Sequence, residues 1–263
     1  MQSIFLSSIE IHPSWQPFFC QGNIQSLLQE IEKEIGNSYT PQSHFVLRFA
    51  ETDLEKVRAV WQGRDPYPQP NKATGRSFEV NGVESWFDKE VNSSLKNIVK
   101  LLHKSYLNRT VCASIEEVRE DIQKGNFPIL PPNHAFFNWE KKGTLFLNNA
   151  FTCEIGNHTQ AGSHEKLWKP FFLLLLAYMA KTNPHIRYFL WGRARDFEKT
   201  LLKYGVEPEY IYKSKHPSTN GDKGTEIENG YVDGYKRNTD FQNNPCFKET
   251  MDIIQWIEIE RTN

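Results

Sequence analysis

The sequence lacks an excess of charge of either sign. Its 263 residues include 31 Lys and Arg against 32 Asp and Glu, which leaves a formal net charge of −1. A broadly basic surface of the kind that grips nucleic acid is therefore excluded, and any nucleic-acid binding must use a local patch. Net charge alone does not identify a partner for this chain.

Closely spaced cysteines are also missing. The four cysteines, Cys20, Cys112, Cys153 and Cys246, lie far apart and form no C-x-x-C pair. This excludes the usual sequence motifs of a zinc or dithiol redox site. We expect reduced thiols and hence a reducing compartment, the cytoplasm or the nucleus, although a disulfide between two of the four stays open.

No apolar run is long enough to cross a bilayer. The longest, FFLLLLAYMA at 171–180, lies between Lys169 and Lys181, whereas a spanning helix needs about 20 apolar residues. We expect this run to form a buried helix. The N-terminal MQSIFLSSIEIHPSW has neither the basic start nor the sustained apolar core of a secretion signal. We therefore expect no membrane partner.

What the sequence does contain is an alternation of predicted strands and helices. This pattern favours an α/β fold with three layers, α/β/α, around a central, mostly parallel four-stranded sheet. No repeat or linker divides the chain, so we expect one domain over residues 1–263 with a long loop at about 219–240. The predicted strands are 57–61, 144–151, 186–191 and 210–212, extending toward 215, and the predicted helices are 24–35, 94–106, 115–124, 168–181 and 194–204.

Polar residues lie at the end of each predicted strand or just after it. In parallel sheets the loops after the strands meet at one edge, so a carboxylate, an amide and an imidazole could share one pocket there. The four segments are Gly63-Arg64-Asp65-Pro66-Tyr67, Leu147-Asn148-Asn149, Trp191-Gly192-Arg193 and His216-Pro217-Ser218.

The segment VWQGRDPYPQPNKATGRSFEV resembles the first signature of the uracil-DNA glycosylases, in which a strand ends in Gly-Gln-Asp-Pro-Tyr-His and a Phe follows. The resemblance continues in the same order along nearly the whole chain. It includes IHPSWQPFF, NWEKKGTLFLNNAFT, QAGSHEKLW, FLWGRARD, KHPST and CFKETMDII. It implies the three-layer fold and an enzyme that hydrolyses the N-glycosidic bond of uracil in DNA, without a cofactor or metal.

The resemblance assigns the catalytic roles to Asp65 and His216. When the bond breaks, positive charge builds on the sugar and negative charge on the base, and both need stabilisation. By resemblance, Asp65 faces the sugar and orients the attacking water or accepts its proton. His216 hydrogen-bonds to uracil O2 as a neutral imidazole.

Four further positions match substrate-binding residues of the family. Asn148 offers an acceptor and donors that suit uracil rather than cytosine. Phe78 stacks on the base, and Tyr67 blocks the methyl group of thymine. Arg64 lies where the family binds mainly through backbone N–H groups.

DNA, single- or double-stranded, is the partner that the resemblance implies, and the target base must leave the helix before it can react. Hydroxyl and backbone N–H groups can bind phosphates without formal charge. We expect a monomer, and a protein inhibitor in the DNA groove stays open. The matching DNA-binding positions are Ser94, Ser163, Pro217, Ser218 and Asn220.

Three positions depart from the family pattern. Arg64 replaces Gln, Pro68 replaces His, and Asn220 stands where the family has a Leu wedge that fills the gap left by the flipped base. Two other functions therefore stay open: removal of another modified pyrimidine, and a DNA-binding or scaffold role that keeps only the fold. Either base flipping is weaker here or the long loop supplies another wedge, from Ile227, Tyr231 or Tyr235.

Overall fold

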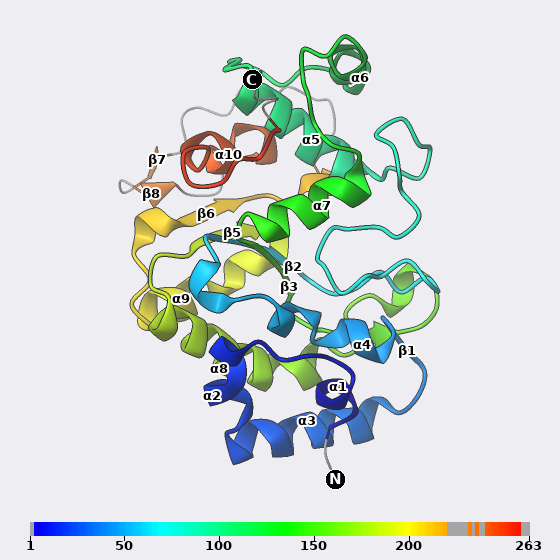
Figure 1. Cartoon of the computed structure of the whole chain (residues 1–263), viewed down its shortest axis with the longest axis vertical. Helices are drawn as coiled ribbons and strands as arrows, with labels where there is room; N and C mark the ends of the chain where they lie inside the picture. The colour runs from blue at the N-terminus through cyan, green and yellow to red at the C-terminus, as the bar shows by residue number, and fades with distance from the viewer. Residues whose placement is uncertain (1–2, 220–230, 233–234, 237–239, 259–263) are drawn as a thin grey trace.

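The computed structural model describes residues 3–219, 231–232, 235–236 and 240–258. Its centre is a four-stranded sheet in the order β3-β2-β5-β6, in which every neighbouring pair is parallel (Figure 1). The expected α/β fold is therefore confirmed. The strands of this sheet are β2 (Ala59–Gly63), β3 (Thr144–Asn148), β5 (Arg187–Trp191) and β6 (Ile211–Ser214).

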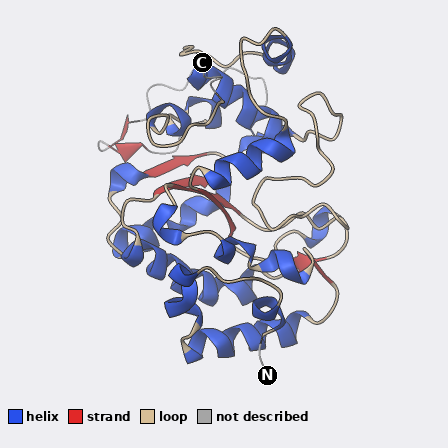
Figure 2. Cartoon of the chain, viewed as in Figure 1, coloured by secondary structure: helices blue, strands red, loops and turns tan. Residues whose placement is uncertain are grey.

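Helices cover both faces of the sheet, which makes the three layers visible in Figures 1 and 2. Helices α1 to α3 and α8 lie below the sheet in this view, and α5, α6, α7 and α10 lie above it. The helices are α1 (Ile4–Ser7), α2 (Gln16–Phe19), α3 (Gly22–Ile35), α4 (Ser43–Val46), α5 (Ser93–Tyr106), α6 (Ile115–Gln123), α7 (Pro132–Lys141), α8 (Glu165–Thr182), α9 (Glu198–Lys203) and α10 (Cys246–Glu249).

Alternation along each strand divides the core in two. Successive side chains of a strand point to opposite faces, so Val60 of β2 joins the core between the sheet and helices α3 and α8, whereas Trp61 joins the core between the sheet and helices α5 and α7. Both faces are apolar because both are covered, as is typical of parallel sheets. Trp61 packs against Trp139 of α7 and Trp191 of β5.

The strands differ from the prediction at their ends. β2 begins and ends two residues later than predicted, because the polar Gln62 and the small Gly63 are buried in the ladder. β3 ends at Asn148 instead of 151. The next residues still follow β2, since the N–H of Asn149 donates to the carbonyl of Gly63 at 3.1 Å.

The helices also differ from the prediction, which did not include the short helices α1, α2, α4 and α10. The predicted helix at 194–204 is a 3₁₀ segment, Gly192–Phe197, followed by the shorter α9. Helix α7 was not predicted from the sequence. It begins at Pro132, whose missing N–H costs nothing in the first turn.

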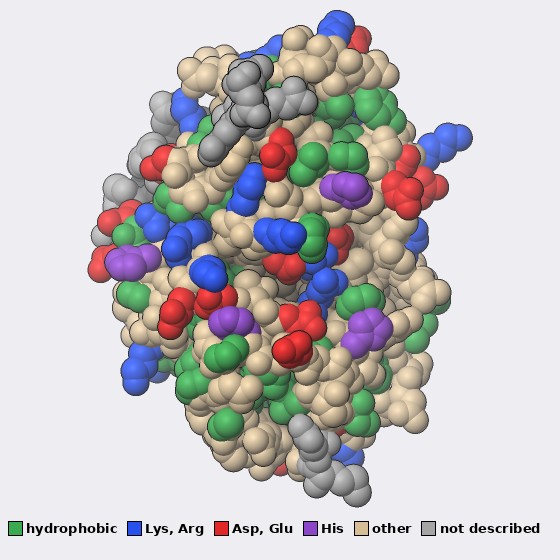
Figure 3. Space-filling model, in the orientation of Figure 1, with side chains coloured by type: hydrophobic (Ala, Val, Ile, Leu, Met, Phe, Trp, Pro, Cys, Tyr) green, Lys and Arg blue, Asp and Glu red, His purple; other side chains and the backbone are tan. Residues whose placement is uncertain are grey.

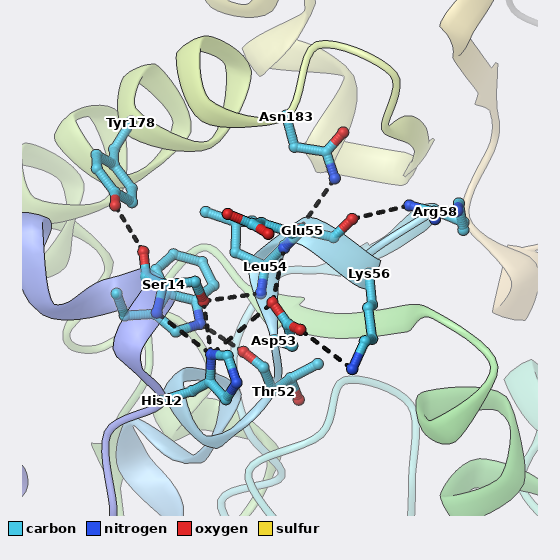
Figure 4. Close-up of polar contacts among 11 residues, drawn as sticks. His12, Ser14, Thr52, Asp53, Leu54, Glu55, Lys56, Arg58, Tyr178 and Asn183 are labelled. Carbon is cyan, nitrogen blue, oxygen red and sulfur yellow. Dashed lines mark hydrogen bonds and ion pairs between the residues drawn. The ribbon is translucent and has the colours of Figure 1, made fainter.

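A polar cluster ties the N-terminal segment to the chain that leads into β2 (Figure 4). The Ser14 hydroxyl accepts a hydrogen bond from the Leu54 N–H at 3.0 Å, and the Ser14 carbonyl accepts one from the Tyr178 hydroxyl at 2.6 Å. Asn183, just after α8, donates to the carbonyls of Leu54 and Val57, both at 2.9 Å. The cluster therefore fixes the start of β2 relative to α8.

Two minor sheets complete the described structure. β1 (Tyr39–Thr40) pairs antiparallel with β4 (Cys153–Glu154), and β7 (Tyr231–Val232) pairs antiparallel with β8 (Tyr235–Lys236). Asn220 and Ile227 lie outside the described residues, as does most of the loop predicted at 219–240. All four cysteines are free. Within the described part of the chain, no helix combines the length and the apolar character needed to span a membrane.

Candidate active site

A cavity of about 220 Å³ opens at the carboxyl edge of the central sheet. Gly63 ends β2 and Asn148 ends β3, and these two residues are partners in the ladder. The turn after β6 adds His216 on the same side. The cavity thus brings together residues from segments far apart in the sequence, including Arg64, Asp65, Tyr67, Phe78, Ser94, Asn148 and His216.

The Asp65 carboxylate is almost fully enclosed at the cavity wall, with 6% of its side chain exposed. Its Oδ2 atom accepts a hydrogen bond from the Gly162 N–H at 2.8 Å, and its Oδ1 atom lies 3.5 Å from Nε of Arg64. Burial raises the pKa of this carboxyl group, because the charged form loses water, while Arg64 and the Gly162 N–H act in the opposite direction. Each oxygen of the Asp65 carboxylate is therefore held by a neighbouring N–H group.

Asn148 presents a side-chain amide to the cavity. Within the described residues its amide has no hydrogen-bond partner, and only 5% of the residue is exposed. Gly63 makes room for it, since a Cβ at that position would lie 2.4 Å from Oδ1 of Asn148. A side-chain amide both donates and accepts hydrogen bonds, so this group at the cavity wall is suited to a ligand that offers both.

The imidazole of His216 is fixed by the turn that carries it. Its Nδ1 atom accepts from the Ser218 N–H at 3.2 Å and lies 2.7 Å from the Ser218 hydroxyl. Nδ1 is thus an acceptor, and a neutral ring then carries its proton on Nε2. Burial lowers the pKa of His216, which favours that neutral form. Gly192 leaves space for the ring, because a Cβ there would lie 2.8 Å from Cβ of His216.

Phe78 forms an apolar wall beside His216. The two ring centroids are 5.9 Å apart and the planes are inclined by 33°. The edge of the Phe78 ring also meets Trp191, at a centroid distance of 5.3 Å. The backbone of Phe78 has φ +66°, a conformation that is strained for a bulky residue and that is found mostly at functional sites.

Tyr67 lies between the cavity and the start of α5. Its hydroxyl accepts a hydrogen bond from Nδ2 of Asn92 at 3.0 Å and lies 3.4 Å from the carbonyl of Phe78. Burial raises the pKa of Tyr67 to about 12, so the ring stays neutral. Oδ1 of Asn92 also caps α5 by accepting from the Leu95 N–H at 2.9 Å. Asn92 therefore links the Tyr67 hydroxyl to the start of α5.

The predicted DNA-binding residues lie in different settings. Ser94 is buried and lines the cavity, whereas Ser163 is exposed outside its wall, where its hydroxyl accepts from the Glu154 N–H. Pro217 is buried, and its carbonyl accepts from the Asn97 side chain at 2.6 Å. Ser218 contacts His216. Asn220 lies outside the described residues.

The two lysines before His216, Lys213 and Lys215, are both paired with carboxylates. Lys213 is paired with Glu198, and Lys215 lies 2.7 Å from Asp240. Figure 3 shows acidic and basic side chains interspersed over the visible face. Among the described residues, no group of three or more His, Cys, Asp or Glu is arranged to hold a metal ion.

Several residues that shape the site carry no signal in the sequence that identifies them. Gly162 and Asn92 act on Asp65 and Tyr67 from distant loops. Arg76 lines the cavity and is bound on both sides by Glu79 and Glu140. Only the fold brings these groups to the cavity.

Comparisons with known proteins show what the chain is similar to. No family model matches the chain. It is 30% identical over 217 residues to a uracil-DNA glycosylase of Enterococcus faecalis, covering 79% of this chain and 82% of that protein. It is 31% identical over 191 residues to a uracil-DNA glycosylase of Yersinia pestis, covering 71% and 70%.

Solved structures of the same kind share the fold. The wild-type UNG of Nitratifractor salsuginis superposes with a TM-score of 0.63 at 22% identity, covering 81% of this chain and 87% of that one. Mimivirus uracil-DNA glycosylase gives 0.63 at 21% identity, covering 96% and 84%. With relatives at this identity over most of their length, the chain belongs to the uracil-DNA glycosylase family.

Proposed function

We propose that this cavity is where the chain hydrolyses the N-glycosidic bond between uracil and deoxyribose in DNA, leaving an abasic site. The observation that carries the proposal is one cavity lined by a held carboxylate, an unpartnered amide and an imidazole with a fixed acceptor nitrogen. These are the groups that a departing pyrimidine and its sugar require.

Asp65 acts on the sugar. As the bond breaks, the ring becomes oxocarbenium-like, and a preorganised carboxylate stabilises that charge more effectively than mobile water does. The same carboxylate orients the attacking water or accepts its proton. Its low exposure supports this role, because little solvent remains to screen its field.

His216 acts on the base. With Nδ1 bonded to Ser218, Nε2–H is the ring donor left for O2 of the departing uracil anion. A neutral donor at this position stabilises negative charge as it develops. The imidazole need not change its protonation state, which agrees with the lowered pKa of His216.

Uracil is recognised by three side chains in this proposal. The Asn148 amide offers an acceptor for N3–H and a donor for O4, the reverse of what cytosine needs. Phe78 supplies the stacking surface, and Tyr67 stands where a C5 methyl group would lie. The cavity of about 220 Å³ admits one base and not a base pair, so the nucleotide must be flipped out at a cost of a few kcal/mol.

DNA is the macromolecular partner in this proposal. Without a broad basic surface, the grip relies on polar side chains and backbone N–H groups at the cavity rim, such as Ser94. A variant of mimivirus UNG has been solved in complex with UGI. We propose by analogy that a protein such as UGI can occupy the DNA-binding face of this chain.

One assay tests the proposal. Single- and double-stranded oligonucleotides carrying uracil, thymine or another modified pyrimidine are incubated with the protein, and alkali-labile abasic sites are counted. We expect cleavage at uracil only, a loss of about 10²–10⁴ in kcat for Asp65→Asn and a loss of about 10²–10³ for His216→Ala. Near-normal turnover by the Asp65 variant would reject the assignment. Cleavage only at another base would favour a different substrate, and binding without cleavage would favour a scaffold role.

A further inference from the structure

The guanidinium of Arg64 lies between two carboxylates at the edge of the cavity. Its Nε atom is 3.2 Å from Oε2 of Glu165, at the start of α8, and 3.5 Å from Oδ1 of Asp65. The Arg64 and Glu165 side chains are 35% and 34% exposed, whereas the Asp65 side chain is 6% exposed. The arginine therefore connects the buried carboxylate to a half-buried one.

Gly162 makes this position of Arg64 possible. It has φ +82°, and a Cβ added to it would lie 2.0 Å from one terminal guanidinium nitrogen of Arg64. The N–H of the same glycine donates to Oδ2 of Asp65. Arg64 thus packs directly over the peptide that holds the other oxygen of the carboxylate.

The charged groups around Asp65 come from three segments. Arg64 follows β2, Glu165 begins α8, and Arg193, after β5, lies with its guanidinium 3.4 Å from Oε2 of Glu165. The Cys153 thiol of β4 donates to the Pro66 carbonyl at 3.3 Å and stays neutral, because its pKa is raised to about 12, mainly by burial and also by Asp65. His216 lies across the cavity. Arg64 is therefore the cation nearest to Asp65 among the described residues.

We propose that Arg64 is a positioning residue for the Asp65 carboxylate, held over Gly162 by Glu165 so that it keeps Asp65 ionised and oriented during base removal. This inference rests on the proposed function, because it assumes that ionised Asp65 acts on the sugar. This role belongs to the Arg64 side chain, whereas the family resemblance assigns substrate binding at this turn mainly to backbone N–H groups.

The pKa of Asp65 is set by opposing effects of its surroundings. Burial disfavours the anion, and the nearby negative charge of Glu165 acts in the same direction, while Arg64 and the Gly162 N–H favour the anion. Glu165 thus has two opposed effects: it anchors Arg64 and it repels Asp65. These effects can be separated, since Gln keeps an acceptor for Nε of Arg64 but has no charge.

The test is the pH dependence of kcat for uracil release. For Arg64→Gln the acid limb moves to higher pH, so kcat at the acid end falls on the order of tenfold more than kcat on the plateau. Arg64→Lys restores part of the activity at acid pH, because it keeps the charge without the planar fork. For Glu165→Gln the limb moves in the opposite direction. A residue with a purely structural role would lower kcat equally at every pH.

Glycine variants give an independent test with a matched control. Gly162→Ala drives a methyl group into the guanidinium, so it reproduces the acid-limb shift of Arg64→Gln. Gly82 has φ +80° and open space around it, so Gly82→Ala imposes similar backbone strain without touching Arg64. We expect it to leave the pH profile unchanged, and thermal unfolding shows that all variants are folded.

The outcomes separate this inference from the proposed function. If wild type releases uracil, Asp65→Asn is inactive and Arg64→Gln keeps the wild-type acid limb, the role of Arg64 is wrong while the function stands. Equal shifts for Gly162→Ala and Gly82→Ala, or a shift of the same sign for Arg64→Gln and Glu165→Gln, also overturn it. If Asp65→Asn is active, the catalytic assignment of Asp65 in the proposed function is wrong, whatever the result for Arg64.

Discussion

At the scale of single residues, Asp65 is held in a form that the folded protein itself disfavours. Burial raises its pKa, and Arg64 and the Gly162 N–H oppose this only in part. The folded state therefore binds a proton at Asp65 more tightly than the unfolded state does. The contribution of the Asp65 carboxyl group to the free energy of unfolding is therefore fully present at low pH, and it is lost as the pH rises through the folded pKa. Catalytic placement and stability are in conflict at this position.

This conflict gives a prediction for Asp65→Asn. The amide keeps an oxygen that can accept the Gly162 N–H but has no charge to bury, so we expect a higher midpoint of unfolding than wild type at pH 7 despite the lost activity. The difference shrinks as the pH falls toward the ordinary carboxyl pKa of 3.8, because the unfolded wild-type chain then begins to bind a proton at this carboxyl group as well. Denaturant titrations between pH 4 and pH 8 measure it. A variant that is less stable than wild type throughout this range would contradict the expectation.

Asn92 gives a second prediction at the same scale, because one side chain caps α5 and holds the Tyr67 hydroxyl. Asn92→Ala loses both bonds and costs about 1 kcal/mol of stability. Asn92→Ser keeps the cap but loses the bond to Tyr67. For both variants we expect the preference for uracil over thymine to fall on the order of tenfold.

Release of thymine and uracil from matched oligonucleotides measures that preference, with Tyr67→Ala as the variant that removes the gate altogether. If Asn92→Ser discriminates as well as wild type while Tyr67→Ala admits thymine, the tyrosine is held by packing and not by Asn92.

At the scale of elements, α7 is joined to the Phe78 turn through buried charges. Arg76 donates from Nε to Oε1 of Glu140 at 3.0 Å and from NH1 to Glu79 at 3.1–3.2 Å. Arg76 and Glu79 flank Phe78, whose backbone is in the left-handed region. The ion pairs therefore hold the strained turn that presents the ring to the cavity.

Removing Glu140 tests this link. Glu140→Ala leaves Arg76 buried and partly uncompensated, which we expect to cost about 3 kcal/mol of stability and to raise KM for uracil-containing DNA as Phe78 loses its support. The exposed neighbour Lys141 serves as the control, since Lys141→Ala removes only a contact with the Phe137 ring and costs under about 1 kcal/mol. Equal losses in the two variants would show that the buried pair does not support the turn.

Sequence patterns predicted the central strands because apolar runs of this kind bury both faces of a parallel sheet. Their ends were less predictable, since burial of Gln62 and Gly63 depends on the neighbouring strand. Helix α7 was missed because its residues 132–141 mix aromatic and polar side chains without a clean apolar stripe. Its burial depends on Trp61 and Trp256.

The candidate site was predictable where a residue directly follows a strand. Asp65, Asn148 and His216 line one cavity, as expected from the carboxyl edge of a parallel sheet. The supporting groups were not predictable, because Gly162 reaches Asp65 across 97 residues of sequence. Contacts of that kind depend on loop conformation, which no local pattern specifies. The prediction of a single domain stays a prediction.

At the scale of the whole molecule, the polar cluster around Asn183 joins three distant segments (Figure 4). Asn183→Ala leaves the carbonyls of Leu54 and Val57 buried without this donor, which we expect to cost about 2–4 kcal/mol. Asn81 is the matched control, because it donates the same kind of bond to the Asn71 carbonyl at an exposed site. Its loss costs about 0.5 kcal/mol.

Thermal unfolding compares the two variants, and kcat is measured at a temperature where both are folded. We expect kcat to be unchanged, because the cluster lies at the amino ends of the strands, away from the cavity. Similar stability losses for Asn81→Ala and Asn183→Ala would mean that the buried cluster does not hold the segments together.

Because the carboxylate and the imidazole lie on turns after β2 and β6, neither exists as part of a reaction centre until the whole sheet has assembled. In a denaturant titration the ability to form abasic sites must vanish together with the last tertiary structure, leaving no weakly active intermediate. A chain that ends before β6 therefore contains the Asp65 carboxylate but cannot form the complete reaction centre.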